Sequence, residues 1–261
     1  MLISAKEIIQ KSIDLYKKDY KVYIPYLILL FIPAGVLGLT EAMLGSFREA
    51  IKVYGFSSTT LIYFVIIVAS SLVSIWISIA FIRTLVNTIN NQPTKTHQEE
   101  LEHSKKLIIP AIIASILTSL AVFGGLLLLI VPGIIFAIWF TFSLYSVAIE
   151  ETSGVEAMRH SKQLVSGRWG DTFWRLLAPG FVFGLVMIII QWIVNLPLGM
   201  ILKLAENSTT LYLVLVGLVA LVNVVVSLII TPLSSLAPTI LYLELKKNPI
   251  TKRVDVPSEV K

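Results

Sequence analysis

The sequence predicts an all-α integral membrane protein, a polytopic bundle of six transmembrane helices arranged as three hairpins. Hydrophobic residues make up 56% of the 261 residues and charged residues only 14%, whereas soluble domains average about 45–50% apolar and about 25% charged residues. Residues 107–149 contain no Asp, Glu, Lys, Arg or His. Because a helix needs only about 20 apolar residues to cross a bilayer, this run holds two spans.

Four further runs without ionisable residues supply the other spans, at residues 22–40, 57–82, 176–202 and 207–243. The long run is expected to reverse at Pro132 and Gly133, since proline cannot continue a helix and glycine is free to take positive φ. Pro232 and Pro238 are expected to break the last run and leave too few residues for a seventh span. The expected spans are about 22–40, 59–82, 107–129, 134–149, 176–200 and 210–231, the last with an extension to 245.

The basic residues predict the orientation of these spans. Eighteen of the 21 Lys and Arg residues fall in four segments, at 1–21, 83–106, 159–175 and 246–261, which lie on one side in a six-span arrangement. The other side carries only Arg48, Lys52 and Lys203. By the positive-inside rule, both termini are expected in the cytoplasm, in a multi-pass protein of the plasma membrane. We expect one membrane domain, 22–245, followed by a cytoplasmic tail, 246–261.

Amphipathic helices are expected on the cytoplasmic side. Residues 1–21 place apolar side chains opposite lysines, as do helices that lie in the headgroup region. A hydroxyl residue followed three positions later by Glu is typical of a capping box at a helix start. The pattern occurs before each of the three hairpins, either as a true threefold repeat or as three ordinary helix starts: Ser4 with Glu7, Thr96 with Glu99, and Ser153 with Glu156.

Residues that could carry catalysis, a metal or a cofactor are not evident. There is no cysteine, and the stretch 97–103 lacks the spacing that places two histidines on one helical face, so we expect a solvated helix of mixed charge there. The basic residues are spread among segments next to the membrane, where anionic lipid is the nearer partner and nucleic acid is not expected. The expected partners are membrane lipids, and the sequence does not identify a protein partner.

The polar side chains inside the spans form one candidate cluster. Gln191 and Asn195 lie four apart on one face of the fifth span, and Asn223 on the sixth could meet them across a helix interface. Such amides commonly join helices, each contributing about 1 kcal/mol or less, and the alternative is that they line a polar path for a substrate. Gly180 and Gly184, also four apart, predict a close helix contact.

The segment 132–174 carries a recognisable pattern at Pro132, Gly133, Gly154, Glu156, Ala157, Ser161, Gly167 and Trp169. On these positions it resembles the membrane domain of the glycerophosphoryl diester phosphodiesterase membrane-domain family and related six-span bacterial proteins. The resemblance implies a membrane domain only, because in the enzymes of that family catalysis belongs to a separate soluble domain, and it brings no catalytic residues. The chain's end, Thr231-Pro232 and then Leu241 to Lys246, is similar to the family's ending.

The sequence thus favours a non-enzymatic accessory or lipid-interacting membrane module. The first alternative is a carrier or channel for a small or lipidic substrate, which predicts a polar, water-accessible cavity between spans. The second alternative is a lipid-modifying enzyme, which predicts that ionisable groups converge at the cytoplasmic rim, such as Glu150, Glu151, His160 and Asp171.

Overall fold

The structure, a computed structural model, describes residues 2–205 and 207–250, and within these residues it contains helices and no strand. Six segments are long and apolar enough to cross a membrane, formed by α1, α3, α4 with α5, α6 with α7, α9 and α10, which confirms the predicted all-α bundle of six spans. The helices are α1 (Ala5–Leu44), α2 (Phe47–Tyr54), α3 (Ser58–Ile89), α4 (His97–Ser104), α5 (Ile108–Leu128), α6 (Ile130–Phe140), α7 (Ser143–Glu150), α8 (Gly154–Val165), α9 (Trp169–Leu204) and α10 (Thr209–Lys247).

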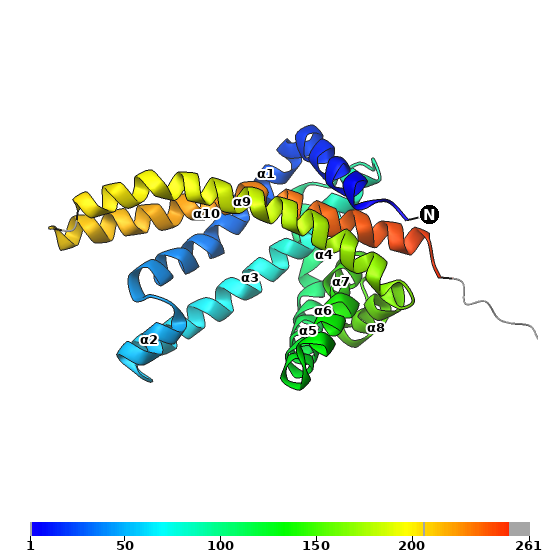
Figure 1. Cartoon of the computed structure of the whole chain (residues 1–261), viewed down its shortest axis with the longest axis horizontal. Helices are drawn as coiled ribbons and strands as arrows, with labels where there is room; N and C mark the ends of the chain where they lie inside the picture. Colours follow the sequence, from blue (N-terminus) through cyan, green and yellow to red (C-terminus); the bar gives the residue numbers. More distant parts are fainter. Residues whose placement is uncertain (1, 206, 251–261) are drawn as a thin grey trace, which may run out of the picture.

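Three hairpins, α1 with α3, α5 with α6, and α9 with α10, diverge from one packed end (Figure 1). We call this end the base; it carries α4, α7, α8 and the start of α1. The three turns that close the hairpins are the tips. At the base, Tyr23, Tyr26 and Phe81 are buried, and Tyr26 Oη lies 2.6 Å from Thr84 Oγ1. Toward the tips many apolar side chains are exposed, as lipid-facing surfaces require.

Helix α1 contains the predicted amphipathic segment and the first span in one element. Asp19 departs from helical geometry, with φ −112° and ψ 16°, so the helix bends where the amphipathic part meets the span. Ile8 and Leu15 are buried in the core of the base. The apolar face of this segment therefore packs against the base of the protein itself, while its lysines remain on the outside.

All three predicted capping boxes are formed. In each, the hydroxyl accepts from the backbone N–H three residues on, and the glutamate accepts from the backbone N–H of the capping residue. A fourth box, Ser46 with Glu49, begins α2 at a tip. These pairs satisfy amides that a helix start leaves without partners, which is why the short helices α2 and α4 begin where they do.

The turn between α5 and α6 lies earlier than expected. Leu129 alone is extended, with φ −165° and ψ 156°, and α6 begins at Ile130, so the prediction of a reversal at Pro132 and Gly133 is wrong. Pro132 lies in the first turn of α6, where a missing amide costs little. Gly133 faces Gly125 instead: a Cβ added at Gly125 would lie 2.9 Å from Gly133 Cα. The glycines allow the two helices to touch, and the contact sets the turn.

Gly125→Ala is expected to destabilise the protein by about 1–3 kcal/mol, because the new methyl group meets backbone atoms of α6 that cannot move aside. Gly124→Ala is the matched control, since a Cβ at Gly124 meets nothing within 4 Å. Alanine there is expected to be neutral or slightly stabilising. Thermal unfolding of both variants in detergent micelles measures the difference, and equal melting temperatures would contradict the close contact.

The prolines do not end the last helix as expected, because α10 continues through Pro232 and Pro238 to Lys247. Proline is tolerated in membrane helices where hydroxyl side chains and neighbouring helices take over the freed backbone groups. The prolines leave the carbonyls of Leu228 and Ser234 without a helical N–H, and the neighbouring threonines bond the adjacent carbonyls: Thr231 Oγ1 to Ser227 O at 3.1 Å, and Thr239 Oγ1 to Ser235 O at 2.6 Å. The sixth span and its extension therefore form one continuous helix.

Candidate functional site

The amide residues singled out from the sequence come together between α9 and α10. Asn195 and Asn223 exchange two side-chain hydrogen bonds, of 2.9 and 3.0 Å. Gln191 Nε2 donates to Ser227 Oγ at 3.2 Å, and Asn195 Nδ2 donates to Gln191 Oε1 at 3.1 Å. The amides thus satisfy one another across the interface, an arrangement that joins the two helices.

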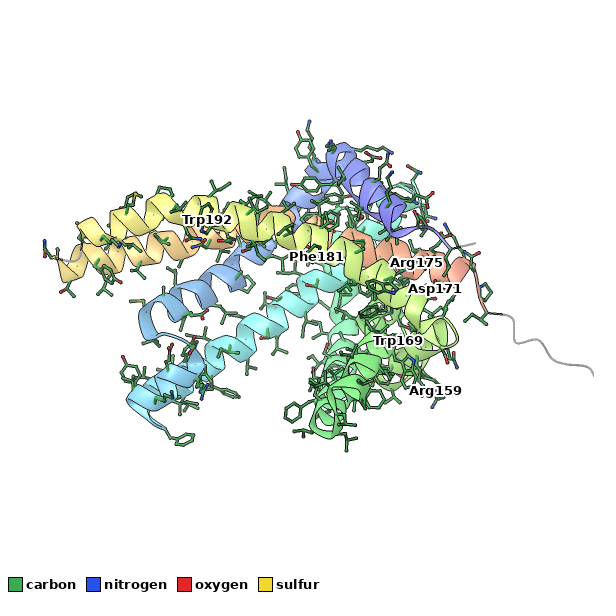
Figure 2. The ribbon with its side chains drawn as sticks, viewed as in Figure 1. Arg159, Trp169, Asp171, Arg175, Phe181 and Trp192 are labelled. Atoms are coloured by element: carbon green, nitrogen blue, oxygen red, sulfur yellow. The ribbon has the colours of Figure 1, made fainter. Side chains whose placement is uncertain are left out.

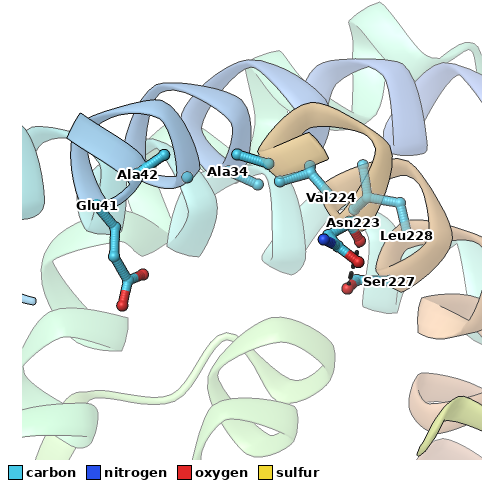
Figure 3. A pocket seen from close by; sticks show the side chains of 9 residues that line it. Ala34, Glu41, Ala42, Asn223, Val224, Ser227 and Leu228 are labelled. Carbon is cyan, nitrogen blue, oxygen red and sulfur yellow. Dashed lines mark hydrogen bonds between the residues drawn. The ribbon is translucent and has the colours of Figure 1, made fainter. Parts of the chain in front are cut away.

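A groove between α1 and α10 begins at this cluster (Figure 3). Its volume is about 470 Å³, and small residues on α1 leave the space. Asn223 and Ser227 are its polar floor, and Glu41 supplies a carboxylate toward the tip of α1. We call it the polar groove; it is lined by Ala34, Gly38, Glu41, Ala42, Ala220, Asn223, Val224, Ser227 and Leu228.

A second concave surface between the same helices is wholly apolar. It has a volume of about 300 Å³ and shares Leu228 with the polar groove. Both surfaces lie along the spans, where α1 and α10 pack closely at Gly35 and Gly38. We call this surface the apolar groove; it is lined by Leu27, Ile28, Phe31, Val225, Leu228 and Ile229.

The fourth span is interrupted at Thr141 and Phe142, about 16 Å along the helix from Ile130. Ser161, on α8, holds this break: its Oγ accepts from Phe142 N at 3.1 Å and donates to Trp139 O at 2.7 Å. Non-helical backbone at membrane depth persists only where protein groups or a polar cavity satisfy it. The hydroxyl of Ser161 therefore supplies partners that the broken helix lacks.

The other positions that carry the family resemblance fix the place of α8 and its neighbours. A Cβ at Gly154 would lie 2.9 Å from Ala114 N, so α8 begins in contact with α5. Ala157 is completely buried, and Gly167 has φ +85°, the left-handed conformation that ends a helix. Trp169 Nε1 lies 3.4 Å from Ile135 O. Together with the capping glutamate of α8, these residues dock the helix under the fourth span.

An ion-pair network joins α3, α4 and the end of α7 at the base. Arg83 Nε lies 2.8 Å from Glu100 Oε2, with the Glu100 side chain only 2% exposed. Arg83 Nη1 donates to Ala148 O at 3.0 Å and to Glu151 Oε1 at 3.2 Å. The prediction of a solvated helix at 97–103 is thus wrong for one face of α4. The ion pair between Arg83 and Glu100 has no signal in the sequence, because the two residues lie 17 positions apart and on different helices.

Glu151 is the most strongly perturbed carboxyl group in this network. Hydrogen bonds from Lys106 and then from His103 hold its pKa at about 2, well below the usual range. Lys106 Nζ lies 2.7 Å from Oε2, and His103 Nε2 lies 2.6 Å from Oε1. The carboxylate is therefore ionised at neutral pH and engaged by three basic side chains, counting Arg83.

The four ionisable groups that the enzyme alternative requires do not all converge on one point. Glu150 turns to α10, where it pairs with Lys246 and accepts from Tyr242 Oη at 3.2 Å. His160 Nδ1 lies 2.8 Å from Ser146 Oγ. Asp171 pairs with Arg175 on α9 at 2.9 Å. Glu151 and Asp171 thus have separate partners, whereas Glu150 and His160 both adjoin Tyr242, whose ring centroid lies 6.3 Å from that of His160.

Comparison with known proteins gives a family without an assigned activity. The chain matches no curated protein and no solved structure. Residues 27–245 match the family described as Domain of unknown function (DUF7847). This segment runs from the first span through the end of the sixth, and includes the amide cluster, the interrupted fourth span and the ion-pair network of α3, α4 and α7. The chain therefore belongs to the DUF7847 family, as a multi-pass membrane protein of six spans.

Proposed function

We propose that the chain is a non-enzymatic membrane module that binds lipid along α1 and α10. The observation that carries this proposal is the pair of grooves between these helices, one apolar and one with a polar floor, both along the spans. In a bilayer such surfaces are filled by acyl chains. Asn223, Ser227 and Glu41 add hydrogen-bonding groups that distinguish the polar groove from an ordinary lipid-facing surface.

The distribution of charge supports a location in the plasma membrane with both termini in the cytoplasm. The base carries α4, α8 and the start of α1, together with most of the basic residues, and the tips carry Arg48, Lys52 and Lys203. The positive-inside rule then assigns the base to the cytoplasm. The relationship to the glycerophosphoryl diester phosphodiesterase membrane domains, which we also propose, agrees with a module role, because in that family catalysis lies outside the membrane domain.

Native mass spectrometry of the full chain, extracted with its own lipids, tests the proposal. The wild type is expected to retain at least one lipid per chain. Ala34→Leu fills the polar groove and is expected to weaken retention about tenfold or more, equivalent to 1.4 kcal/mol. Ala69→Leu, on an exposed face of α3, is the matched control and should retain lipid as the wild type does.

Two results would contradict this function. One is a wild-type protein that stays folded in the spectrometer and carries no lipid. The other is equal retention by the wild type and the Ala34→Leu variant, since lipid would then be bound without regard to the polar groove.

A carrier is the second candidate, and the interruption of the fourth span favours it. Discontinuous membrane helices commonly surround the substrate sites of transporters. Thr141, at the interruption, lines a cavity of about 360 Å³ together with Ser115, Thr118, Ser119 and Ser143. The Oγ1 atom of Thr118 is buried and has no hydrogen-bond partner among the described residues. Uptake assays in proteoliposomes distinguish the candidates, since a lipid-binding module moves no solute.

A further inference from the structure

A second cavity meets the interrupted fourth span on its other side, between α7, α9 and α10. We call it the arginine cavity. Its volume is about 320 Å³, and its polar lining consists of Thr141, Tyr145, Arg175 and Ser234. Arg175 is the one charged residue in the lining, while the Arg83 network lies elsewhere at the base. The cavity therefore presents a positive charge and three hydroxyl groups to whatever occupies it.

The guanidinium of Arg175 is held in place from outside the cavity. Its Nε donates to Ile3 O at 2.7 Å, and its Nη1 donates to Asp171 O at 3.0 Å and to the Asp171 carboxylate at 2.9 Å. Figure 2 shows Arg175 and Asp171 close together on α9. Its Nη2 has no hydrogen-bond partner within residues 2–205 and 207–250. Asp171 does not line the cavity, and its side chain is 63% exposed. It therefore positions the guanidinium of Arg175, while water screens the negative charge of the Asp171 carboxylate.

Two of the hydroxyl groups are also free to bind a ligand. Neither Thr141 Oγ1 nor Ser234 Oγ makes a side-chain hydrogen bond to another part of the chain that the structure describes. Along α9 the lining runs from Arg175 past Gly180 to Phe183, about 12 Å from a charged end near the base to an apolar end. A guanidinium whose Nη2 group has no partner among the described residues, next to hydroxyl groups, is suited to an oxygen of a phosphate group.

We propose that the arginine cavity binds a phosphate-bearing anion, with the phosphate at Arg175 and any apolar part directed toward Phe183. The phosphate belongs either to an anionic phospholipid headgroup or to a soluble phosphate compound. The site is separate from the grooves along α1 and α10, so the inference does not depend on lipid binding there.

The glycines of α9 provide the test and its control. A Cβ at Gly180 or at Gly184 meets nothing within 4 Å, so the expectation of a close helix contact at these glycines is wrong. A side chain at either position therefore begins in open space. Gly180 lines the arginine cavity and Gly184 does not, so Gly180→Leu fills the cavity while Gly184→Leu makes the same substitution one turn away.

The full chain in detergent is titrated with inorganic phosphate against chloride at matched ionic strength, and separately with phosphatidylglycerol against phosphatidylcholine. Thermal shift and native mass spectrometry report binding. The wild type and Gly184→Leu are expected to bind one of the two phosphate probes, and Gly180→Leu at least about tenfold more weakly, equivalent to 1.4 kcal/mol. Thr141→Val, which removes a hydroxyl at nearly constant volume, should weaken binding to a smaller extent.

Binding of inorganic phosphate would identify a soluble ligand, and binding of phosphatidylglycerol alone would identify a lipid headgroup. The proposal is overturned if neither probe binds the wild type, which would mean that the cavity holds only water. It is also overturned if Gly180→Leu binds as tightly as Gly184→Leu. Neither result bears on the Ala34→Leu experiment, because the polar groove and the arginine cavity share no lining residue.

Discussion

Arg83→Met is expected to destabilise the protein by about 3–5 kcal/mol, because it leaves the Glu100 carboxylate buried without a counter-ion. Among residues 2–205 and 207–250, only Asn87 Nδ2, at 3.5 Å, would remain as a hydrogen-bond partner of the carboxylate. The substitution also removes the donors that hold Ala148 O and Glu151, so α3 loses its link to the end of α7. Thermal unfolding and denaturing-detergent titration of the full chain measure the loss.

A double variant separates the cost of an unpaired charge from the cost of lost packing. Arg83→Met with Glu100→Met removes both charges, and we expect it to recover much of the stability lost in the single variant. Lys105→Ala is the control for an exposed pair: Lys105 is 53% exposed and its partner Glu102 is 72% exposed, so the cost should stay below about 1 kcal/mol. Equal destabilisation by the single and double variants would contradict an unpaired buried charge as the source of the loss.

The spans and capping boxes could be predicted because their signals are local. A stretch of about 20 uncharged residues is enough to identify a span, and a capping box is complete within four residues. The amide cluster could also be predicted from the sequence, since the spacing of Gln191 and Asn195 places them on one helical face. Their partner, Asn223, also carries an amide side chain, and it lies at a comparable depth in the neighbouring span.

The turn at Leu129, the burial of Glu100 and the interruption at Thr141 depend on contacts between segments distant in sequence. Gly125 and Gly133 look like ordinary glycines until the two helices are placed together. Prolines gave a misleading signal for the same reason, because a helix in a packed membrane protein continues through proline when other groups satisfy the backbone. The fourth span breaks where the sequence contains neither proline nor glycine, and its partner Ser161 lies 19 residues after Phe142.

Ser161→Ala is expected to cost about 2–4 kcal/mol, since it takes a partner from one buried and one half-buried backbone group at the interruption, each loss costing about 1–3 kcal/mol. Phe142 N–H would lose its acceptor and Trp139 C=O its donor. Ser12→Ala is a closely matched control: both serines are completely buried, but Ser12 Oγ donates only to Ile8 O within its own helix. Ser12→Ala leaves no backbone N–H without an acceptor, so we expect it to lower the stability by less than about 1 kcal/mol.

Comparing Ser161→Ala with Ser12→Ala also shows whether the interruption of the fourth span shapes the arginine cavity. If Ser161 serves only to seal a break, Ser161→Ala lowers the melting temperature and leaves phosphate binding in the arginine cavity unchanged once the protein is folded. If the break shapes the cavity, the same variant weakens binding at temperatures well below unfolding, because Thr141 shifts with the loosened backbone. Measuring affinity and stability on one preparation of each variant separates these outcomes, and Ser12→Ala should change neither. In the second case Ser161, one of the positions that carry the family resemblance, links the stability of the fourth span to ligand binding in the arginine cavity.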